Sequence, residues 1–533
     1  MKANQAERFE VHLETETDID KVRAIALYLV EQVEALRRQI GKLEAEISRL
    51  KKAGASSDEL EQQLKQTKEQ LELLRGEVFE PSSEKTKTAE AGGENKTKDR
   101  PGSTPKSKPA AGHGPHPQPD LQREERTHTL DEADRRCPKC GGLLEPIEGQ
   151  FESSEQIDVH KRTYVVVEEK RQKYGCRCGA CVETAPGPLK PIKGGRYSLR
   201  FGIDVAVNKY EYHAPLERQA RQMRREGLEI QSQTLWDQIN AIARINEPLL
   251  ERFRRYLLDD EPVLGADETR WPILDKRGRN KGGKNWYVWV IGSPRAVLYR
   301  IASSRGKAVA EELLDGFEGF LVTDAYAVYI SLAKDRAGIV SVFCWAHVRR
   351  LFVKAAKFYP EAKEYIELIN QMFDLDDQAG HGDDPETLAK RKAIRRMKIR
   401  PLVGKLFKMA LTCKALDTSA LGKAVNYMLN LRKGLVRFLN DPRIPLHNNA
   451  SEQALRDPVL GRKNHYGSKS ERGTEVAALM YTIMENASRN DLKPHDYLLY
   501  STATHLLGGT PLLPHELTPK QLEKEIEALQ DYL

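Results

Sequence analysis

Between residues 261 and 355, strand-like apolar segments alternate with helical ones, and their order restricts the fold more than any other feature. Runs of β-branched and aromatic residues predict three consecutive strands in "EPVLGADE", "NWYVWVIG" and "RAVLYRIA". A helical stretch, "GKAVAEELLDGF", precedes a fourth strand in "GFLVTDAYAVY", and "GIVSVFCWAHVRRLFVKA" predicts a fifth strand that continues into a helix. The resulting order, β-β-β-α-β-α-β, indicates an α/β domain.

Acidic residues occupy three comparable places in this pattern. Asp267 lies where the first strand is expected to end, Asp324 ends the fourth strand, and Glu452 opens a later helix in "PLHNNASEQALRDPVLGRK". Clustered carboxylates repel one another, and a divalent cation offsets that repulsion, so three carboxylates can hold two Mg²⁺ ions at a phosphodiester. Together with the strand order, they predict an RNase H-like core for metal-dependent phosphoryl transfer. The alternative is that each aspartate only caps a turn.

The motif "CWAH" lies beside this predicted centre. Cys344 and His347 have the spacing of a metal-binding pair, but no partner pair lies nearby in the sequence, which argues against zinc there. His347 lies one helical turn beyond a predicted strand. We therefore expect a role in the core or in positioning DNA, and we include His347 among the candidate catalytic residues.

Five of the seven cysteines lie between residues 137 and 181 and predict a zinc ribbon-like module over residues 131–190. The segment between the two cysteine clusters, "QIDVHKRTYVVVEEKRQKYG", predicts a hairpin of strands, and cysteine pairs on turns at its end suit tetrahedral Zn²⁺. The predicted ligands share the same pair spacing and are Cys137, Cys140, Cys178 and Cys181. Cys176 competes as a ligand. The zinc either only stabilises the module or also serves DNA contact.

The N-terminal segment, residues 15–79, carries heptad repeats. β-Branched residues recur at one core position and leucines at the other: Val33, Ile40, Ile47 and Leu29, Leu36, Leu43, Leu50. This pattern favours a parallel two-stranded coiled coil, resembling a leucine zipper, that forms a homodimer. The repeat breaks at "KKAGASSDEL", where Ser56 and Glu59 fit a capping box, and then resumes. A helical hairpin folded on itself is the alternative.

Residues 80–130 contain almost no large apolar side chains and predict a disordered linker. Its lysines could contact phosphates, although a solvated tether is the simpler hypothesis. Within residues 195–255, "PLERQARQMRREGLEIQSQTLWDQINAIA" predicts a helix, a glycine-containing turn and a helix starting near Ser232, as in helix-turn-helix domains. The first helix has a basic face suited to DNA, formed by Arg218, Arg221, Arg224 and Arg225. A helical pair that packs against a neighbour is the alternative.

The overall charge agrees with a nucleic-acid partner without requiring one. The formal net charge is +7 and the pI is about 8.8. The sequence has no early apolar segment of signal-peptide type and no apolar stretch of membrane-spanning length. We therefore expect neither a signal peptide nor a membrane segment.

Several motifs resemble the transposases of the IS66 insertion-sequence family, and the resemblance covers nearly all of residues 15–515. The core motifs are "GADETRWPIL", "LVTDAYAVY", "CWAHVRRLF" and "NNASEQALR". Supporting motifs lie outside the core: "FEPSSEK", "CPKCGG", "KYGCRCGACVETAPGP", "GGRYS", "PLERQ", "REGL", "SQTLWDQI" and "LLPHEL". This family is of the DDE type. Gln453 departs from the arginine expected after the catalytic glutamate, which puts one phosphate contact in doubt.

The resemblance implies a DNA transposase that cleaves the 3′ ends of its element and transfers them to target DNA. Asp267, Asp324 and Glu452 would form the DDE triad and hold two Mg²⁺ ions, with Asp267 bridging both. Cys344 and His347 resemble a C-x₂-H signature found in several DDE groups. The catalytic domain would span residues 260–495, with a helical insertion at about 360–440, followed by a helical tail at 496–533.

The resemblance also implies partners and a location. The expected partners are DNA at the element ends and the target, a second copy of the chain, and small accessory proteins of the same element. The expected location is the bacterial cytoplasm, in association with the nucleoid. Two alternatives remain: a structure-selective nuclease that uses the same triad, and a non-enzymatic DNA-binding regulator derived from a transposase. The intact carboxylates argue against the regulator.

Overall fold

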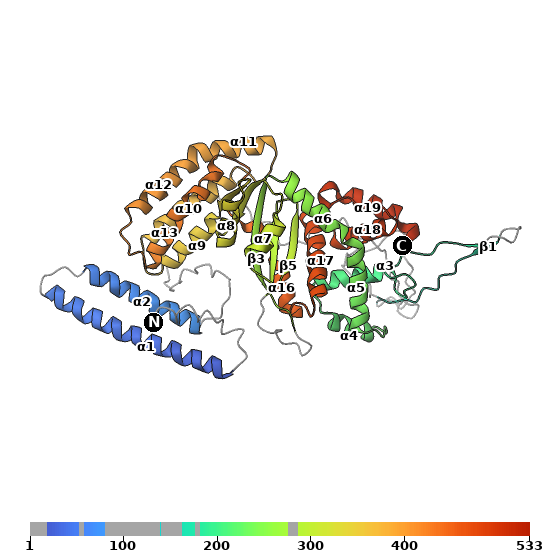
Figure 1. Cartoon of the computed structure of the whole chain (residues 1–533), viewed down its shortest axis with the longest axis horizontal. Helices are drawn as coiled ribbons and strands as arrows, with labels where there is room; N and C mark the ends of the chain where they lie inside the picture. The colour runs from blue at the N-terminus through green and yellow to red at the C-terminus, as the bar shows by residue number, and fades with distance from the viewer. Residues whose placement is uncertain (1–18, 53–57, 80–138, 140–162, 176–181, 275–285) are drawn as a thin grey trace. The chain divides into compact units, whose positions relative to one another are not determined.

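The computed structural model describes residues 19–52, 58–79, 139, 163–175, 182–274 and 286–533. Its centre is a mixed sheet of five strands (Figure 1): β3 (Val263–Trp271), β4 (Trp286–Gly292), β5 (Val297–Ala302), β6 (Gly319–Thr323) and β7 (Ile339–Phe343). The strand order is β5-β4-β3-β6-β7. The β3–β4 and β4–β5 pairs are antiparallel, whereas β3–β6 and β6–β7 are parallel. The five predicted strands and their order along the chain are thus confirmed.

The central strand β3 is longer than predicted. The prediction that it ends near Asp267 is wrong, because β4 continues to pair with β3 as far as Trp271↔Trp286. On the other side, β6 pairs with β3 only as far as Gly265↔Val322. Asp267 therefore lies where β3 no longer pairs with β6 but still pairs with β4.

Helices connect and cover the strands. The connecting helices are α7 (Lys307–Leu313), α8 (Ala327–Asp335) and α9 (Trp345–Ala355), and α17 (Glu471–Arg489) packs on the edge strand β5. Asn486 of α17 accepts a hydrogen bond from the Val297 N–H at 2.9 Å and donates one to the Val297 carbonyl at 2.7 Å. Thr482 accepts from the Tyr299 N–H at 3.1 Å. These side chains satisfy backbone groups that would otherwise be unpaired at the sheet edge.

In the chain between β7 and Glu452, where the insertion was expected, lies a helical layer whose hydrophobic core also includes Val322 of β6 and Val342 of β7. Its main elements are α10 (Ala362–Asp377), α11 (Pro385–Ile394), the π-helical turn η4 (Arg395–Ile399), α12 (Arg400–Thr412), α13 (Ala420–Asn430), α14 (Arg432–Leu435) and η5 (Arg437–Leu439). Arg395 is buried and connects separate segments of this layer through hydrogen bonds. Its guanidinium donates to the Asp376 carboxylate at 2.6 and 2.8 Å and to the Ile444 carbonyl at 2.8 Å.

The helices before the sheet and those near the C-terminus pack together. They are α3 (Leu199–Tyr210), α4 (Leu216–Arg225), α5 (Ser232–Asn246), α6 (Pro248–Arg255) and η3 (Tyr256–Asp260), with α16 (Arg456–His465), α18 (Pro494–Leu506), η6 (Pro514–Glu516), α19 (Pro519–Ala528) and η7 (Gln530–Tyr532). Gly227, at φ 91°, turns the chain between α4 and α5, in a conformation that favours glycine. The predicted helix–turn–helix order is therefore present. Asn246 donates to Thr502 at 2.8 Å and joins α5 to α18.

The predicted strand hairpin between the cysteine clusters, residues 156–175, is present in the described residues only as a short strand at its C-terminal end. Residues 163–172 form no strand, and the exposed Val165, Val166 and Val167 show no strand pairing. Instead, β1 (Lys173–Gly175) pairs antiparallel with β2 (Val182–Thr184), so the strands flank the "CRCGAC" segment. The linker, the Ser56 cap and the five clustered cysteines lie outside the described residues.

The two N-terminal helices, α1 (Ile19–Lys52) and α2 (Asp58–Phe79), pack against each other in antiparallel fashion. Lys51 pairs with Glu61 at 2.8 Å, and Lys68 pairs with Glu44 at 2.6 Å. Within a single chain the heptad segment is therefore a hairpin, which was the alternative to the zipper. The dimer stays a prediction, because a second copy can add to the exposed part of the same seam.

Placing lysines at Leu36 and Leu43, two partly buried positions of the α1 seam, tests this prediction. Charges in a heptad seam oppose association, so the double variant is expected to be monomeric in light scattering. Gln39→Lys, at an exposed position of the same helix, is the control and should keep the mass of the unmodified protein. An unchanged mass in the double variant would show that the seam serves only the hairpin.

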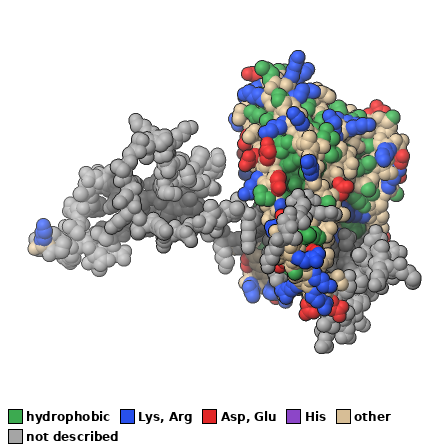
Figure 2. All heavy atoms as spheres, turned by 90° about the vertical axis from the view of Figure 1, so that its left-hand side faces the viewer, with side chains coloured by type: hydrophobic (Ala, Val, Ile, Leu, Met, Phe, Trp, Pro, Cys, Tyr) green, Lys and Arg blue, Asp and Glu red, His purple; other side chains and the backbone are tan. Residues whose placement is uncertain are grey.

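The surface is mixed in charge. On the face drawn in Figure 2, Lys and Arg side chains are interspersed with acidic and hydrophobic ones. This agrees with the small net charge of +7. Among the described residues, no helix has the length and apolar character needed to cross a membrane.

Candidate active site

Asp267 on β3 is half-buried and lies among other carboxylates. Burial raises its pKa to about 7, and the negative charges of Glu268, Asp324 and Glu452 add to this effect. The Glu268 N–H donates to Asp267 Oδ1 at 2.8 Å, and this hydrogen bond lowers the pKa of Asp267. The three carboxylates predicted from the sequence therefore belong to one electrostatic environment, although they come from three separate segments of the chain.

The turn after β6 holds Asp324. The Tyr326 N–H donates to Asp324 Oδ1 at 2.9 Å, a local bond that is typical of aspartate in turns. Ala325 adopts φ 71°, a left-handed conformation that costs a non-glycine residue about 1–3 kcal/mol. The Tyr427 hydroxyl, from the helical insertion, donates to the Asp324 carbonyl at 2.8 Å. The insertion therefore helps to fix this turn beside the sheet.

Glu452 lies on α15 (Asn449–Ala454), which packs directly on β3 and β4. Asn448, just before the helix, donates from its side chain to the Ala266 carbonyl at 2.9 Å. A Cβ at Gly265 would lie 2.6 Å from Asn448 Oδ1 and would also collide with Ser451 Oγ. Only glycine therefore allows α15 to approach β3 this closely, and this approach brings Glu452 toward Asp267.

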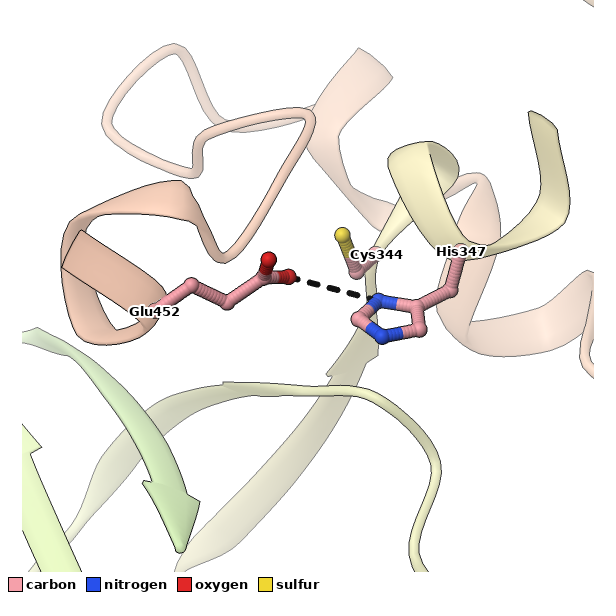
Figure 3. A group of neighbouring side chains, drawn as sticks. All are labelled: Cys344, His347 and Glu452. Carbon is pink, nitrogen blue, oxygen red and sulfur yellow. Dashed lines mark ion pairs between the residues drawn. The ribbon is translucent and has the colours of Figure 1, made fainter. Parts of the chain in front are cut away.

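Glu452 also meets the "CWAH" segment, as Figure 3 shows. The His347 Nδ1 lies 3.6 Å from Glu452 Oε1, and Arg350 Nη2 lies 3.4 Å from Glu452 Oε2. Arg350 Nη1 lies 3.1 Å from His347 Nε2. The His347 pKa is lowered, with burial as the largest cause. His347 therefore lies beside Glu452, and so does Arg350, one helical turn later on the same face of α9.

Cys344 completes this group from the N-cap position of α9. Burial raises the pKa of its thiol to about 11. The backbone N–H of Asn448 donates to Sγ at 3.2 Å, and this hydrogen bond lowers the pKa. One ligand atom each from Cys344, His347 and Glu452 can be chosen so that all lie within 4.8 Å of one another. The sequence pairs Cys344 with His347, but no local signal indicates that Glu452, more than a hundred residues away, lies beside them.

Glu268 has different partners from its neighbour Asp267. Its carboxylate is buried and accepts hydrogen bonds from Arg305 at 2.9 and 2.7 Å and from the Tyr329 hydroxyl at 2.8 Å. Successive side chains on a strand point to opposite faces, so one member of the acidic pair can join the other carboxylates while the other is held in the core. Sequence reasoning missed Arg305 and Tyr329, because no local signal links them to β3.

The predicted basic face lies on α4. The opposite side of the helix buries Gln219, Ala220 and Met223. The four arginines of the helix are all exposed: Arg218, Arg221, Arg224 and Arg225. In the described structure these arginines make no contact with the three carboxylates.

Comparison with known proteins identifies the family. Residues 194–476, over half of the chain, match the family described as "Transposase IS66 family", and residues 134–179 match the "zinc-finger binding domain of transposase IS66". Two similar proteins from Sinorhizobium fredii (strain NBRC 101917 / NGR234) carry the names "Uncharacterized protein y4jD" and "Uncharacterized protein y4hP". The first is 30% identical over 400 residues, which cover 72% of this chain and 77% of that protein. The second is 28% identical over 399 residues, covering 70% and 71%. The chain therefore belongs to the IS66 family of insertion-sequence transposases and carries the zinc-finger domain of that family.

Proposed function

We propose that this transposase cleaves the 3′ ends of its element and joins them to target DNA through a DDE triad of Asp267, Asp324 and Glu452. The electrostatic coupling of these carboxylates, which come from β3, the turn after β6 and α15, carries the proposal. Asp324 and Glu452 both help to raise the pKa of Asp267, so their charges act on the same point. Such a cluster of like charges is costly without a cation, and costly arrangements of ionisable groups are concentrated at functional sites.

The topology supports an RNase H-like core. The first strand, β3, is central, with two antiparallel strands on one side and two parallel strands on the other. The element order between β3 and α9 is the order that predicted this core from the sequence. Asp267 and Asp324 then come from neighbouring strands, and Glu452 comes from a helix packed on the first strand.

The donor set fits Mg²⁺, because three carboxylates offer hard oxygen ligands. When bound, two such ions would activate the attacking oxygen and stabilise the leaving oxygen of a phosphodiester. The protein's own contribution is to hold the ligands in place. The Glu268 N–H orients Asp267, the Tyr326 N–H orients Asp324, and Arg350 contacts Glu452.

The reaction has two steps, and in each of them an oxygen nucleophile attacks the phosphorus of a phosphodiester. Water first cleaves the strand at the element end and leaves a 3′-hydroxyl there. That hydroxyl then attacks a target phosphodiester, so a new bond forms to the element as the target strand breaks. The side chain of Arg350 is half-exposed and places a cationic group beside Glu452. Gln453, the residue after Glu452, has no charge. We assign Arg350 the phosphate contact that an arginine at position 453 would otherwise make.

Labelled duplexes ending in the terminal repeats that flank the gene test this function. In Mg²⁺, the full chain should release a 3′-hydroxyl at the repeat boundary and then form joined products with a target plasmid. Cleavage without joined products would indicate a nuclease instead. Binding without cleavage would indicate a regulator derived from a transposase.

DNA recognition is proposed for the α4–α5 unit and the zinc module. Arg218→Ala and Arg221→Ala should each reduce the salt dependence of DNA binding by about one ion, because each removes one phosphate contact. Binding curves at several salt concentrations measure this slope. Lys524→Ala on α19, an exposed position on another helix, is the control and should leave the slope unchanged. Unchanged slopes in both arginine variants would assign α4 a packing role.

The zinc module should hold about one Zn²⁺ per chain, because the clustered cysteine thiolates supply the four ligands of a tetrahedral site. Elemental analysis of protein purified without added metal measures this. Cys137→Ser should lose the ion, whereas Cys413→Ser, a cysteine of the helical insertion, should retain it. A folded module free of zinc would contradict the prediction. Dimerisation through residues 15–79, accessory proteins and nucleoid association remain proposals.

A further inference from the structure

A mixed cysteine, histidine and glutamate group stands beside the proposed triad and differs from it in chemistry. This Cys-His-Glu cluster consists of Cys344, His347 and Glu452, whose chosen ligand atoms all lie within 4.8 Å of one another. Thiolate and imidazole suit borderline metals such as Zn²⁺ and Co²⁺, whereas carboxylates alone suit Mg²⁺. The cluster therefore has a ligand preference that the triad does not share.

Two atoms of the cluster lack hydrogen-bond partners. His347 Nδ1 and Glu452 Oε1 are both buried, and neither has a partner in the described structure. They face each other at 3.6 Å, which is too long for a hydrogen bond. In tetrahedral zinc sites with bonds of 2.0–2.2 Å, two ligand atoms lie about 3.4 Å apart. The two atoms are thus spaced as ligands of one shared cation.

We propose that Cys344, His347 and Glu452 bind one borderline divalent cation, of the class of Zn²⁺ or Co²⁺, with a fourth position open to water. Binding forms a bond from the cation to Cys344 Sγ, and the thiol proton leaves to solvent. Sγ already accepts the Asn448 N–H and lies at the N-terminus of the 11-residue helix α9, where a negative sulfur is stabilised.

Arg350 opposes this cation. Binding through Nδ1 places the ring proton of His347 on Nε2, which faces the Arg350 guanidinium at 3.1 Å. Both groups would then be donors, so Arg350 must turn toward solvent, and its 54% exposed side chain allows this. Removing the charge of Arg350 should therefore strengthen metal binding rather than weaken it.

A cation in the cluster would take Glu452 Oε1 away from the triad, so Zn²⁺ should inhibit cleavage in Mg²⁺. This consequence rests on the proposed function, but binding itself does not. The two can be separated, because Asp267 and Asp324 belong to the triad and not to the cluster. Asp267→Asn and Asp324→Asn should leave binding to the cluster in place.

Cobalt titration of the full chain, with its zinc module already loaded, tests the proposal. A cobalt–thiolate bond gives a charge-transfer absorption, and the unmodified protein should show it saturating at one additional ion per chain. Cys344→Ser should lose this absorption, while Cys413→Ser, the matched control, should keep it. Glu452→Gln should weaken the binding, and Arg350→Gln should tighten it.

An absorption that is the same in Cys344→Ser as in the unmodified protein would overturn the proposal. If that variant does not fold, His347→Gln replaces it, because the His347 side chain is 22% exposed and tolerates change better. His347→Gln should keep a folded circular dichroism spectrum and lose affinity for cobalt. Unchanged affinity there would also overturn the site, whether or not the triad variants still cleave DNA.

Discussion

Asp267→Asn, Asp324→Asn and Glu452→Gln are each expected to abolish Mg²⁺-dependent cleavage and strand transfer while leaving DNA binding intact. Each substitution keeps the size of the side chain and removes one anionic oxygen ligand. The loss of several kcal/mol of transition-state stabilisation corresponds to a fall in rate on the order of a thousandfold. Cleavage of labelled element ends measures the rate, and gel shifts measure binding.

Glu268→Gln is the matched control, because it changes the other acidic residue of the same pair. Glu268 is bound to Arg305 and Tyr329, so the amide should slightly lower stability and leave the cleavage rate within about tenfold. An Asp267→Asn protein that cleaves at the normal rate would falsify the triad. Loss of activity in Glu268→Gln with activity kept in Asp267→Asn would show that the wrong member of the pair had been chosen.

Gly265→Ala is expected to lower cleavage by about a hundredfold without removing any catalytic group. The added Cβ would lie 2.6 Å from Asn448 Oδ1 and collide with Ser451 Oγ, so α15 must move away from β3. Glu452 moves with this helix, and a displacement of about 1 Å at a reacting group can cost about a hundredfold in rate. Single-turnover cleavage of element ends measures the effect.

Gly404→Ala provides the control, since a Cβ there meets nothing within 4 Å. That change lies within α12 and should raise stability by up to about 1 kcal/mol without altering cleavage. Thermal unfolding separates a moved helix from an unfolded protein. Normal cleavage in a folded Gly265→Ala protein would show that the position of α15 does not set the position of Glu452.

The proposed cluster gives Glu452 two competing uses. As a triad member it shares the environment of Asp267, and as a cluster member it faces His347 and Cys344. Arg350 contacts both Glu452 and His347, so its position decides which use is favoured. We expect that Zn²⁺ added to an active protein reduces cleavage and that excess Mg²⁺ restores it only in part.

The sequence by itself determined the parts that depend on neighbouring residues. The apolar patterns predicted all five strands and the helices between them, whereas the helical insertion before Glu452 was expected from the resemblance to the IS66 family and the long spacing from Asp324. The positions of Asp324 after β6 and Glu452 at the start of α15 also followed, because strand ends and helix starts have local signals. These predictions succeed because burial and backbone preference are expressed within about ten residues of chain.

Tertiary structure decided where strands end and which side chains meet. β3 extends past Asp267 because β4 pairs with it, and β1 finds its partner β2 across the cysteine segment. The heptad segment forms a hairpin in the single chain because α2 can cover the same seam that a second copy would cover. Glu452 meets His347, and Glu268 meets Arg305, only because packing brings distant segments together. Sequence pattern specifies the surface that each segment must bury, but several partners can bury it, and the close packing of the whole chain selects one.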